Sequence, residues 1–189
     1  PPKLLYSFYG APSSVTRREI FKMPAHPRGV VIDSPAHIFF IVVKPQSAQM
    51  RYASLMTESK FVLAPKGYGP SSLRLFEVMK AGRVPVIISD KLVYPAGPDW
   101  SKCSVTVPED QIHKIPELLE KEEAGWPEKS RLARKAWEDY FAPDSMFNYF
   151  VESALELKKN EQKMSLHLKY LHLKAMLDYM AGKIARENL

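Results

Sequence analysis

The stretch over residues 59–94 constrains the fold most tightly, because short apolar runs alternate there with a glycine-bearing loop and an amphipathic segment. Residues 61–64 are an apolar run that ends at a proline, as a buried parallel strand would. Residues 73–81 have the spacing of a short helix, with serines before it and Gly82 as a stop. Residues 84–89 form a second apolar run. This order predicts a β-loop-α-β unit, which aims the free N–H groups of the helix start at the region above the strand ends.

The helix expected over 73–81 has two different faces at 3.6 residues per turn. Arg74 and Glu77 look outward one turn apart, on a stripe with Ala81. A cation beside backbone donors suits a diphosphate, and a carboxylate one turn deeper can accept hydrogen bonds from ribose hydroxyls. The alternative is a solvated face on which Glu77 pairs with Arg74 or Lys80. The opposite face, expected to pack on the sheet, consists of Ser72, Leu75, Phe76 and Met79.

This block resembles the signature of the exostosin family of glycosyltransferases. The resemblance rests on the segments SKFVLAPKG at 59–67, SLRLFEV at 72–78 and GRVPVIISD at 82–90. The sequence departs from the family pattern at Val62 and Arg83, where cysteine is common, which puts a disulfide or thiol role in doubt. Looser similarity involves residues 4–10 with Arg17 and Arg18, and the closing segments 100–108 and 137–141.

The resemblance implies the C-terminal, nucleotide-sugar-binding half of a glycosyltransferase with two Rossmann domains (GT-B). Such an enzyme inverts the anomeric carbon of its donor, which the resemblance implies to be a UDP-sugar. Such enzymes stabilise the leaving diphosphate with a helix start and basic side chains, and the sequence has no Asp-x-Asp motif for a metal ion. No cofactor or metal is therefore expected. The partners implied are a nucleotide sugar, a glycan acceptor and an N-terminal acceptor-binding domain on the same or another chain.

The nucleotide-sugar-binding residues follow by matching positions to the family motif. Phosphate contacts are expected from basic and hydroxyl side chains, and glycines let the backbone approach. Glu77 is expected to hold ribose, and Asp90 either lines the donor pocket or only ends its strand. Arg17 and Arg18 either bind phosphate or form a surface pair. The complete set is Gly10, Arg17, Arg18, Lys66, Gly67, Gly69, Ser71, Ser72, Arg74, Glu77 and Asp90. The catalytic base is not identified, and His26 and His113 are the weak local candidates.

Composition limits the remaining function classes. The chain has 189 residues, of which 46% are hydrophobic, so it can bury an ordinary core. Its net charge of +6 fits nucleic acid, anionic lipid, or a solvated surface with a site for anionic nucleotide sugars. No motif of an RNA-binding sheet is visible, so nucleic acid is not expected. The single cysteine, Cys103, excludes an internal disulfide and a cysteine-rich zinc site.

Alternating strands and helices predict an α/β fold, a Rossmann-like, mostly parallel sheet sandwiched by helices. Strands are expected at 3–9, 30–32, 38–43, 61–64, 84–89 and 105–107. Helices are expected at 16–23, 47–59, 73–81, 111–121, 127–141 and from 145, with Asp144 as N-cap. The expected core includes Met50, Leu55 and Met56 from the second of these helices, and Ile112, Ile115, Leu118 and Leu119 from the fourth.

Residues 1–159 are predicted to form the nucleotide-sugar-binding domain, and 160–189 a C-terminal amphipathic helix. This helix carries a heptad-like stripe that packs on its own domain or a missing neighbour, or else makes a helix-mediated oligomer. His167 and His172 fall on different faces, so a metal pair is not expected there. The stripe consists of Leu166, Tyr170, Leu173, Leu177, Met180 and Ile184.

Two other function classes compete with sugar transfer. One is a non-catalytic nucleotide-binding or scaffold module that recruits a partner through the C-terminal helix. The other is a P-loop phosphotransferase, but the loop at 66–72 lacks the Gly-Lys-(Ser/Thr) order that cradles a triphosphate. No apolar run approaches the roughly 20 residues that span a bilayer. The expected location is cytoplasmic or membrane-associated for a bacterial or viral protein, and the Golgi lumen for a eukaryotic one.

Overall fold

The computed structural model describes residues 2–34, 46–159 and 174. The strand predicted at 38–43 lies outside these residues. The C-terminal extension over 160–189, with its apolar stripe and its two histidines, also lies outside these residues, except for Lys174. The chain separates into two compact units, residues 1–149 and 150–189. The predicted domain boundary after residue 159 stays a prediction.

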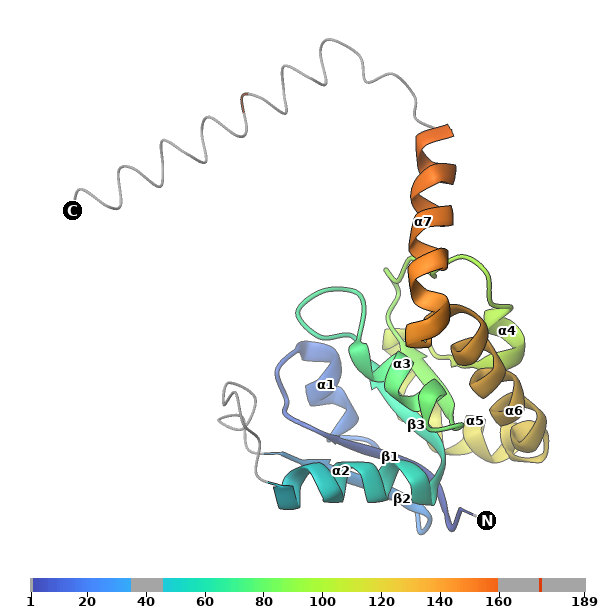
Figure 1. Ribbon diagram of the computed structural model, residues 1–189. Helices are drawn as coiled ribbons and strands as arrows, with labels where there is room; N and C mark the ends of the chain where they lie inside the picture. The colour runs from blue at the N-terminus through green and yellow to red at the C-terminus, as the bar shows by residue number, and fades with distance from the viewer. Residues whose placement is uncertain (1, 35–45, 160–173, 175–189) are drawn as a thin grey trace. The chain divides into compact units, whose positions relative to one another are not determined.

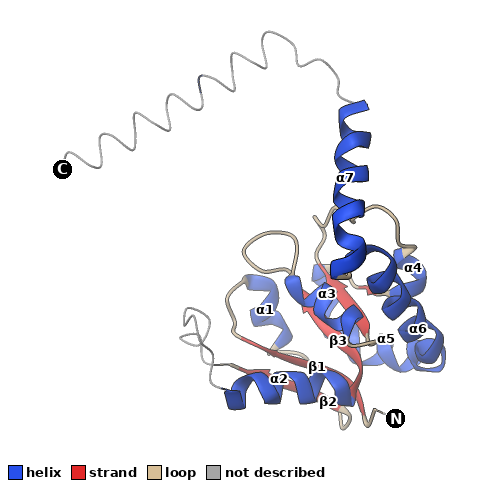
Figure 2. Ribbon diagram, viewed as in Figure 1, coloured by secondary structure: helices blue, strands red, loops and turns tan. Residues whose placement is uncertain are grey.

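A parallel sheet forms the centre of the first unit (Figures 1 and 2). Its strands lie in the order β2-β1-β3-β4-β5, and each neighbouring pair is parallel. The sheet with its helices confirms the predicted Rossmann-like α/β class. The strands are β1 (Leu4–Gly10), β2 (Gly29–Asp33), β3 (Ser59–Pro65), β4 (Val84–Ile88) and β5 (Val105–Thr106).

The helices follow the strands in the order expected for alternating elements. The α-helices are α1 (Val15–Ile20), α2 (Gln46–Glu58), α3 (Leu73–Lys80), α4 (Trp100–Cys103), α5 (Ile115–Glu122), α6 (Trp126–Ala136) and α7 (Pro143–Lys159). Two 3-10 helices, η2 (Glu109–Lys114) and η3 (Glu123–Gly125), and a π-helix, η4 (Trp137–Phe141), complete the described elements. None of the described helices is long and apolar enough to cross a membrane.

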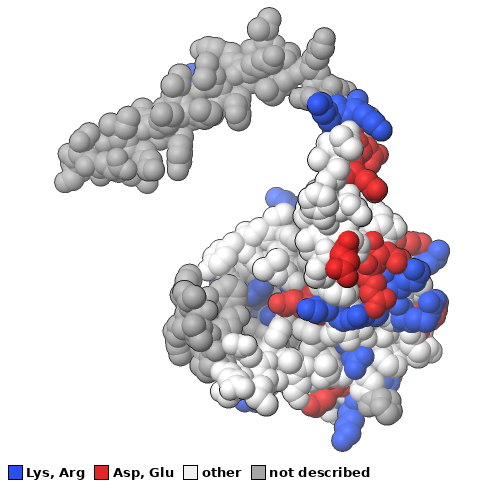
Figure 3. All heavy atoms as spheres, in the orientation of Figure 1, with Lys and Arg blue, Asp and Glu red and all other residues white. Residues whose placement is uncertain are grey.

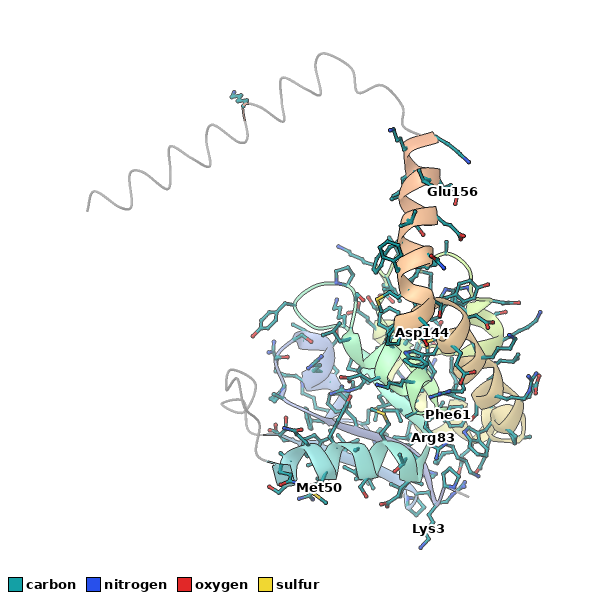
Figure 4. The ribbon with its side chains drawn as sticks, in the orientation of Figure 1. Lys3, Met50, Phe61, Arg83, Asp144 and Glu156 are labelled. Atoms are coloured by element: carbon teal, nitrogen blue, oxygen red, sulfur yellow. The ribbon has the colours of Figure 1, made fainter. Side chains whose placement is uncertain are left out.

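The two faces of the sheet bury different helices because side chains alternate along each strand. On one face, Phe61 and Leu63 of β3 pack with Ile20 of α1 and with Ile115 of α5. On the other face, Val62 packs with residues of α2 and α3, and Ile87 with residues of α3, α4 and α6. Figure 4 shows Phe61 among the packed elements. Helices α1 and α3 therefore lie on opposite faces of the sheet.

The end of α3 has the geometry of a Schellman motif, as the predicted stop at Gly82 requires. Gly82 adopts φ +61°, a conformation that glycine reaches without strain. Its N–H donates to the Met79 carbonyl at 2.9 Å, and the Arg83 N–H donates to Val78 at 3.0 Å. The Arg83 side chain then donates twice to the Thr57 carbonyl, at 3.1 and 2.7 Å. Arg83, where the family often has cysteine, thus caps the end of α2 (Figure 4).

Some element-level predictions are wrong. Met50, expected in the core, is 64% exposed and lies on the outer side of α2 (Figure 4), opposite the stripe that buries Met56. The helix expected over 111–121 is a 3-10 helix up to Lys114 and then α5, and Gln111 has non-helical angles of φ −108° and ψ 15°. Asp144 is not an N-cap, since α7 already begins at Pro143, a residue suited to a first helical position.

The outer surface near α6 and η4 carries charges of both signs, which Figure 3 shows interspersed. These charges pair along the chain, as in Arg131–Glu128 at 2.6 Å and Arg134–Glu138 at 2.6 Å. Such exposed pairs contribute little to stability. This surface fits the solvated interpretation of the basic composition better than a nucleic-acid interface.

Candidate functional site

The sheet order reverses between β1 and β3, and in open α/β sheets such a reversal places a crevice at the carboxyl edge of the strands. Strand β1 continues through α1 to β2 on one side, while β3 continues through α3 to β4 on the other. Because α1 and α3 cover opposite faces, their starting turns diverge above β1 and β3. In open α/β sheets, ligands bind at this kind of topological switch point.

The α1 side of the crevice contributes Arg17, which is only 5% exposed. Ser14 caps α1 by accepting a hydrogen bond from the Arg17 backbone N–H at 3.2 Å. The Arg17 side chain crosses to the other half of the site, where its Nε donates to the Lys66 carbonyl at 3.2 Å. Its neighbour Arg18 is exposed, and its Nη1 lies 3.5 Å from the Pro12 carbonyl oxygen. The predicted arginine pair is therefore split between the crevice and the surface.

The α3 side contributes Arg74, which bends back over the end of β1. Its Nη2 donates to the Tyr9 carbonyl at 2.7 Å, and its guanidinium carbon lies 4.6 Å from the centre of the Phe8 ring. A Cβ at Gly10 would meet Arg74 Nη2 at 3.0 Å. Gly10 thus gives the guanidinium its space. The prediction that Arg74 looks outward from α3 holds only in part, since the side chain is half-buried.

Three buried polar atoms of the described residues lack a hydrogen-bond partner, and all three lie at this edge of the sheet: Arg17 Nη1, Arg74 Nη1 and Ser89 Oγ. Ser89 directly follows β4. Burial, and next the positive charge of Arg74, lower the pKa of the Arg17 guanidinium from its ordinary value. Buried donors without partners and two neighbouring cations are costly unless an anion meets them. An anion with several acceptor oxygens would satisfy these donors and offset the two charges.

Glu77 stands one turn beyond Arg74 on α3 and is exposed. Its Oε2 accepts a hydrogen bond from the Tyr52 hydroxyl of α2 at 2.5 Å. Within residues 46–159, no ion pair of Glu77 with Arg74 or Lys80 is found, so the alternative interpretation of a paired, solvated face gains no support. The carboxylate keeps free acceptor capacity for a ligand hydroxyl.

Lys66, predicted to contact phosphate, is held by a carboxylate that the sequence analysis did not single out. Its Nζ lies 2.6 Å from Glu109 Oε2, which also accepts from the Thr16 hydroxyl at 2.7 Å. Burial of Glu109 acts against these contacts, but Lys66 and Thr16 hold its pKa below the ordinary value overall. Asp90 exchanges two 3.1 Å hydrogen bonds with Glu109, one through each backbone N–H. These contacts favour the interpretation that Asp90 ends its strand.

The loop between β3 and α3 supplies the remaining predicted residues. Gly67 and Ser72 are half-buried, whereas Gly69 and Ser71 are exposed. Ser72 takes the N-cap position of α3, although its side chain makes no capping hydrogen bond. Tyr68, at the tip of this loop, is 81% exposed. The free N–H groups at the start of α3 therefore face the same edge of the sheet as Arg17.

The candidate bases lie apart from the crevice or on the surface. His26 precedes β2, at the amino edge, where its Nε2 lies 3.0 Å from Glu120 Oε1. His113 lies in η2 and is exposed. His26 therefore lies at the edge of the sheet opposite the switch point, away from Arg17 and Arg74. The described residues hold no cluster of three or more His, Cys, Asp or Glu that could bind a metal ion.

Sequence reasoning missed Tyr52, Glu109 and Ser89. Ser89 had a usable signal, since a polar residue directly after a buried parallel strand falls at the ligand-binding edge. Tyr52 had no such signal, because it lies on α2 and contacts Arg74 and Glu77 of α3 only in the folded chain. Glu109 is likewise brought to Thr16 and Lys66 only by the fold.

The fold defines an α/β protein of the Rossmann-like class, with unpartnered cationic donors at the carboxyl edge of its sheet. The Exostosin GT47 domain matches residues 16–121, more than half of the chain. The chain belongs to this exostosin family.

Several relatives are similar to part of the chain. An exostosin-1 homolog of Caenorhabditis elegans is 39% identical over 70 residues, which are 36% of this chain and 18% of the relative. Exostosin-2 of Bos taurus is 33% identical over 99 residues, 51% of this chain and 14% of the relative. The probable glucuronoxylan glucuronosyltransferase IRX7 of Arabidopsis thaliana is 41% identical over 71 residues, 36% of this chain and 16% of the relative. The chain therefore spans less than a fifth of each of these relatives.

Proposed function

We propose that this chain is the donor-binding half of a GT-B glycosyltransferase that transfers sugar from a nucleotide sugar to a glycan hydroxyl. The observation that carries the proposal is the pair of guanidinium groups of Arg17 and Arg74, each with a buried, unpartnered Nη1 at the switch point of the sheet. Family membership supports the reaction class, and the relatives named above include a probable glucuronosyltransferase. We further propose UDP as the nucleotide and inversion as the stereochemical outcome, from the family resemblance.

Different residues are proposed to bind the diphosphate and the ribose of the donor. Arg17 and Arg74 meet the diphosphate, together with the N–H groups at the start of α3. Glu77 accepts hydrogen bonds from ribose. In the transition state, negative charge grows on the leaving diphosphate, and preorganised cations stabilise it there. We propose that the two guanidinium groups supply this charge without a metal ion, so transfer should persist in a chelator.

The animal and plant origin of the relatives favours the Golgi lumen among the predicted locations. An acceptor-binding domain on the same or another chain would supply the acceptor site and the general base. The alternative function, nucleotide binding without transfer, remains distinguishable. It would show UDP affinity but no release of UDP from UDP-sugars in the presence of glycan acceptors.

Calorimetric titration with UDP tests the donor site directly. Arg17→Met and Arg74→Met keep the apolar stems but remove the guanidinium groups, and each should weaken UDP binding at least tenfold, about 1.4 kcal/mol. Arg131→Met is the matched control, because Arg131 lies on the exposed face of α6 beside Glu128. Wild-type affinity in both crevice variants would contradict the site. Arg18→Met, measured in parallel, decides whether the exposed neighbour of Arg17 takes part.

A further inference from the structure

A tyrosine hydroxyl from α2 stands between the two functional side chains of α3. The Tyr52 hydroxyl donates to Glu77 Oε2 at 2.5 Å and accepts from Arg74 Nε at 3.3 Å. A hydroxyl can do both at once, because it has one donor and two acceptor lone pairs. The carboxylate and the guanidinium thus meet through Tyr52 instead of directly.

The Tyr52 ring is itself fixed from several sides. Its centroid lies 6.2 Å from the Tyr9 ring, and the Arg74 guanidinium carbon lies 5.6 Å from it. The ring also packs against the small core that contains Met56 and Val62. Burial raises the pKa of the Tyr52 hydroxyl to about 12, so the group keeps its proton at neutral pH and remains a donor to Glu77. Position and protonation state are both set before a ligand arrives.

These contacts decide which donor of Arg74 is available. Nε is used by Tyr52 and Nη2 by the Tyr9 carbonyl, and the buried Nη1 is left without a partner. Arg74 and Glu77 are three residues apart on one helix, a spacing at which opposite charges can pair directly. Without the Tyr52 hydroxyl between them, the two side chains would be able to form this ion pair. Such a pair would neutralise the Arg74 guanidinium and would also use the acceptor oxygens of the Glu77 carboxylate.

We infer that Tyr52 is a positioning residue for the nucleotide: it holds Arg74 toward the diphosphate and Glu77 toward the ribose, and it prevents their direct pairing. The inference rests on the proposed function for the identity of the ligand. It assigns a role in nucleotide affinity to α2, a helix outside the family's signature block.

The variant Tyr52→Phe removes the hydroxyl and keeps the ring under Arg74. We expect UDP affinity to fall about tenfold, because hydrogen bonds to two charged groups are lost. Tyr94→Phe is the control, since its hydroxyl has a single described partner, the Thr106 hydroxyl at 2.9 Å. Thermal unfolding of both variants is measured with the titrations. A fall in affinity without a fall in melting temperature supports positioning, whereas unchanged affinity overturns it.

A double-mutant cycle separates positioning from a local structural effect. Tyr52→Phe and Glu77→Gln should lose affinity non-additively, because Tyr52 acts through Glu77 and Arg74. Strictly additive losses would overturn the inference. The exchange rate of the Arg74 Nε proton, followed by NMR, should rise in Tyr52→Phe without any ligand. If wild-type protein failed to bind UDP, the proposed function would fall, and this exchange rate would still decide whether Tyr52 holds Arg74.

Discussion

At the scale of single residues, Arg74 shows why a guanidinium and not merely a positive charge is needed. Its Nε donates to a tyrosine hydroxyl and its Nη2 to a backbone carbonyl, and its buried Nη1 is left without a partner. The planar fork of arginine can serve these directions together, whereas the ammonium of lysine is a compact point charge on a flexible stem. Charge and orientation are thus supplied by one side chain.

Arg74→Lys should therefore behave like a loss of function despite keeping the charge. We expect UDP affinity to fall about tenfold, close to the effect of Arg74→Met, because the fixed fork is lost. Arg131→Lys serves as the control, since its exposed pair with Glu128 tolerates either cation. The measurement is calorimetric titration. Affinity within twofold of wild type would mean that only charge matters at this position.

Gly10 makes a second residue-scale prediction. A methyl group there would stand 3.0 Å from Arg74 Nη2 and 3.0 Å from the Phe8 ring, so the guanidinium must shift. Gly10→Ala should weaken UDP binding several-fold, because the shifted guanidinium would no longer meet the diphosphate in the same geometry. Gly125→Ala is the matched control, because a Cβ there meets no atom within 4 Å. Equal affinities of the two variants would show that Arg74 adapts freely.

The sequence predicted the identity of these residues better than their directions. The signature block placed Arg74 and Glu77 on one helix, one turn apart, and Gly82 at the helix end. It did not show that Arg74 turns back over Phe8, or that Tyr52 joins it to Glu77. Those contacts link residues distant in the chain, and helical periodicity carries no information about them. Half-buried polar partners such as Glu109 have the same origin.

At the scale of elements, a charge cluster at the amino edge joins strands to the helical layer. Glu123 of η3 contacts Arg28 Nη1 at 2.5 Å and Nη2 at 2.9 Å, and Lys60 Nζ at 2.5 Å. Arg28 precedes β2 and Lys60 lies in β3. Hydrogen bonds from these cations, Arg28 first, lower the pKa of Glu123 from 4.5 to about 2. The ionised carboxylate is therefore favoured in the folded state.

This shift predicts a pH dependence of stability with a definite sign. The folded pKa is depressed, so the stabilisation is fully present above pH 4.5 and is lost as pH falls toward about 2. Glu123→Gln should lower the free energy of unfolding above pH 4.5. Below pH 4.5, the free energy of unfolding of this variant should fall less steeply with decreasing pH than that of the wild type. Urea unfolding across this range measures both. Glu128→Gln, at an exposed pair on α6, is the control and should change the profile little.

Element types were predictable where the pattern was strong. Buried parallel strands such as β3 and β4 have continuous apolar runs, and these predicted strands are confirmed. The break at Gln111 and the one-turn helix α4 were missed because both are too short for a periodic signal. Met50 was misplaced because apolar character alone does not say which side of α2 meets the sheet.

At the scale of the whole unit, the strand order creates the site. The sequence predicted a parallel sheet but not its order, and therefore not the switch point between β1 and β3. Only this order brings Arg17, which follows β1, beside Arg74, which follows β3. Two cations that are far apart in the chain thus share one crevice. Without a ligand, the desolvation of Arg17 and its repulsion by Arg74 therefore disfavour the charged guanidinium in the folded state.

This arrangement predicts that stability and binding respond in opposite directions to one substitution. UDP at a hundred times its dissociation constant should stabilise the wild type by about 2.7 kcal/mol. That corresponds to a rise in melting temperature of about 5–11 °C for a domain of this size. Arg17→Met should lose most of this rise, and yet the ligand-free variant should melt at the wild-type temperature or above it. The reason is that it removes a buried guanidinium whose Nη1 has no partner.

Scanning calorimetry with and without UDP, with Arg131→Met as the control, measures both effects. A marked loss of ligand-free stability in Arg17→Met would mean that its hydrogen bond to the Lys66 carbonyl, at 3.2 Å, outweighs the cost of burying the charge. Arg17 would then stabilise the fold by linking α1 to the β3–α3 loop through this hydrogen bond. Retention of the full UDP-induced rise would show that the nucleotide does not meet this guanidinium. The two outcomes are independent, so the experiment separates the cost of the buried cation from its use.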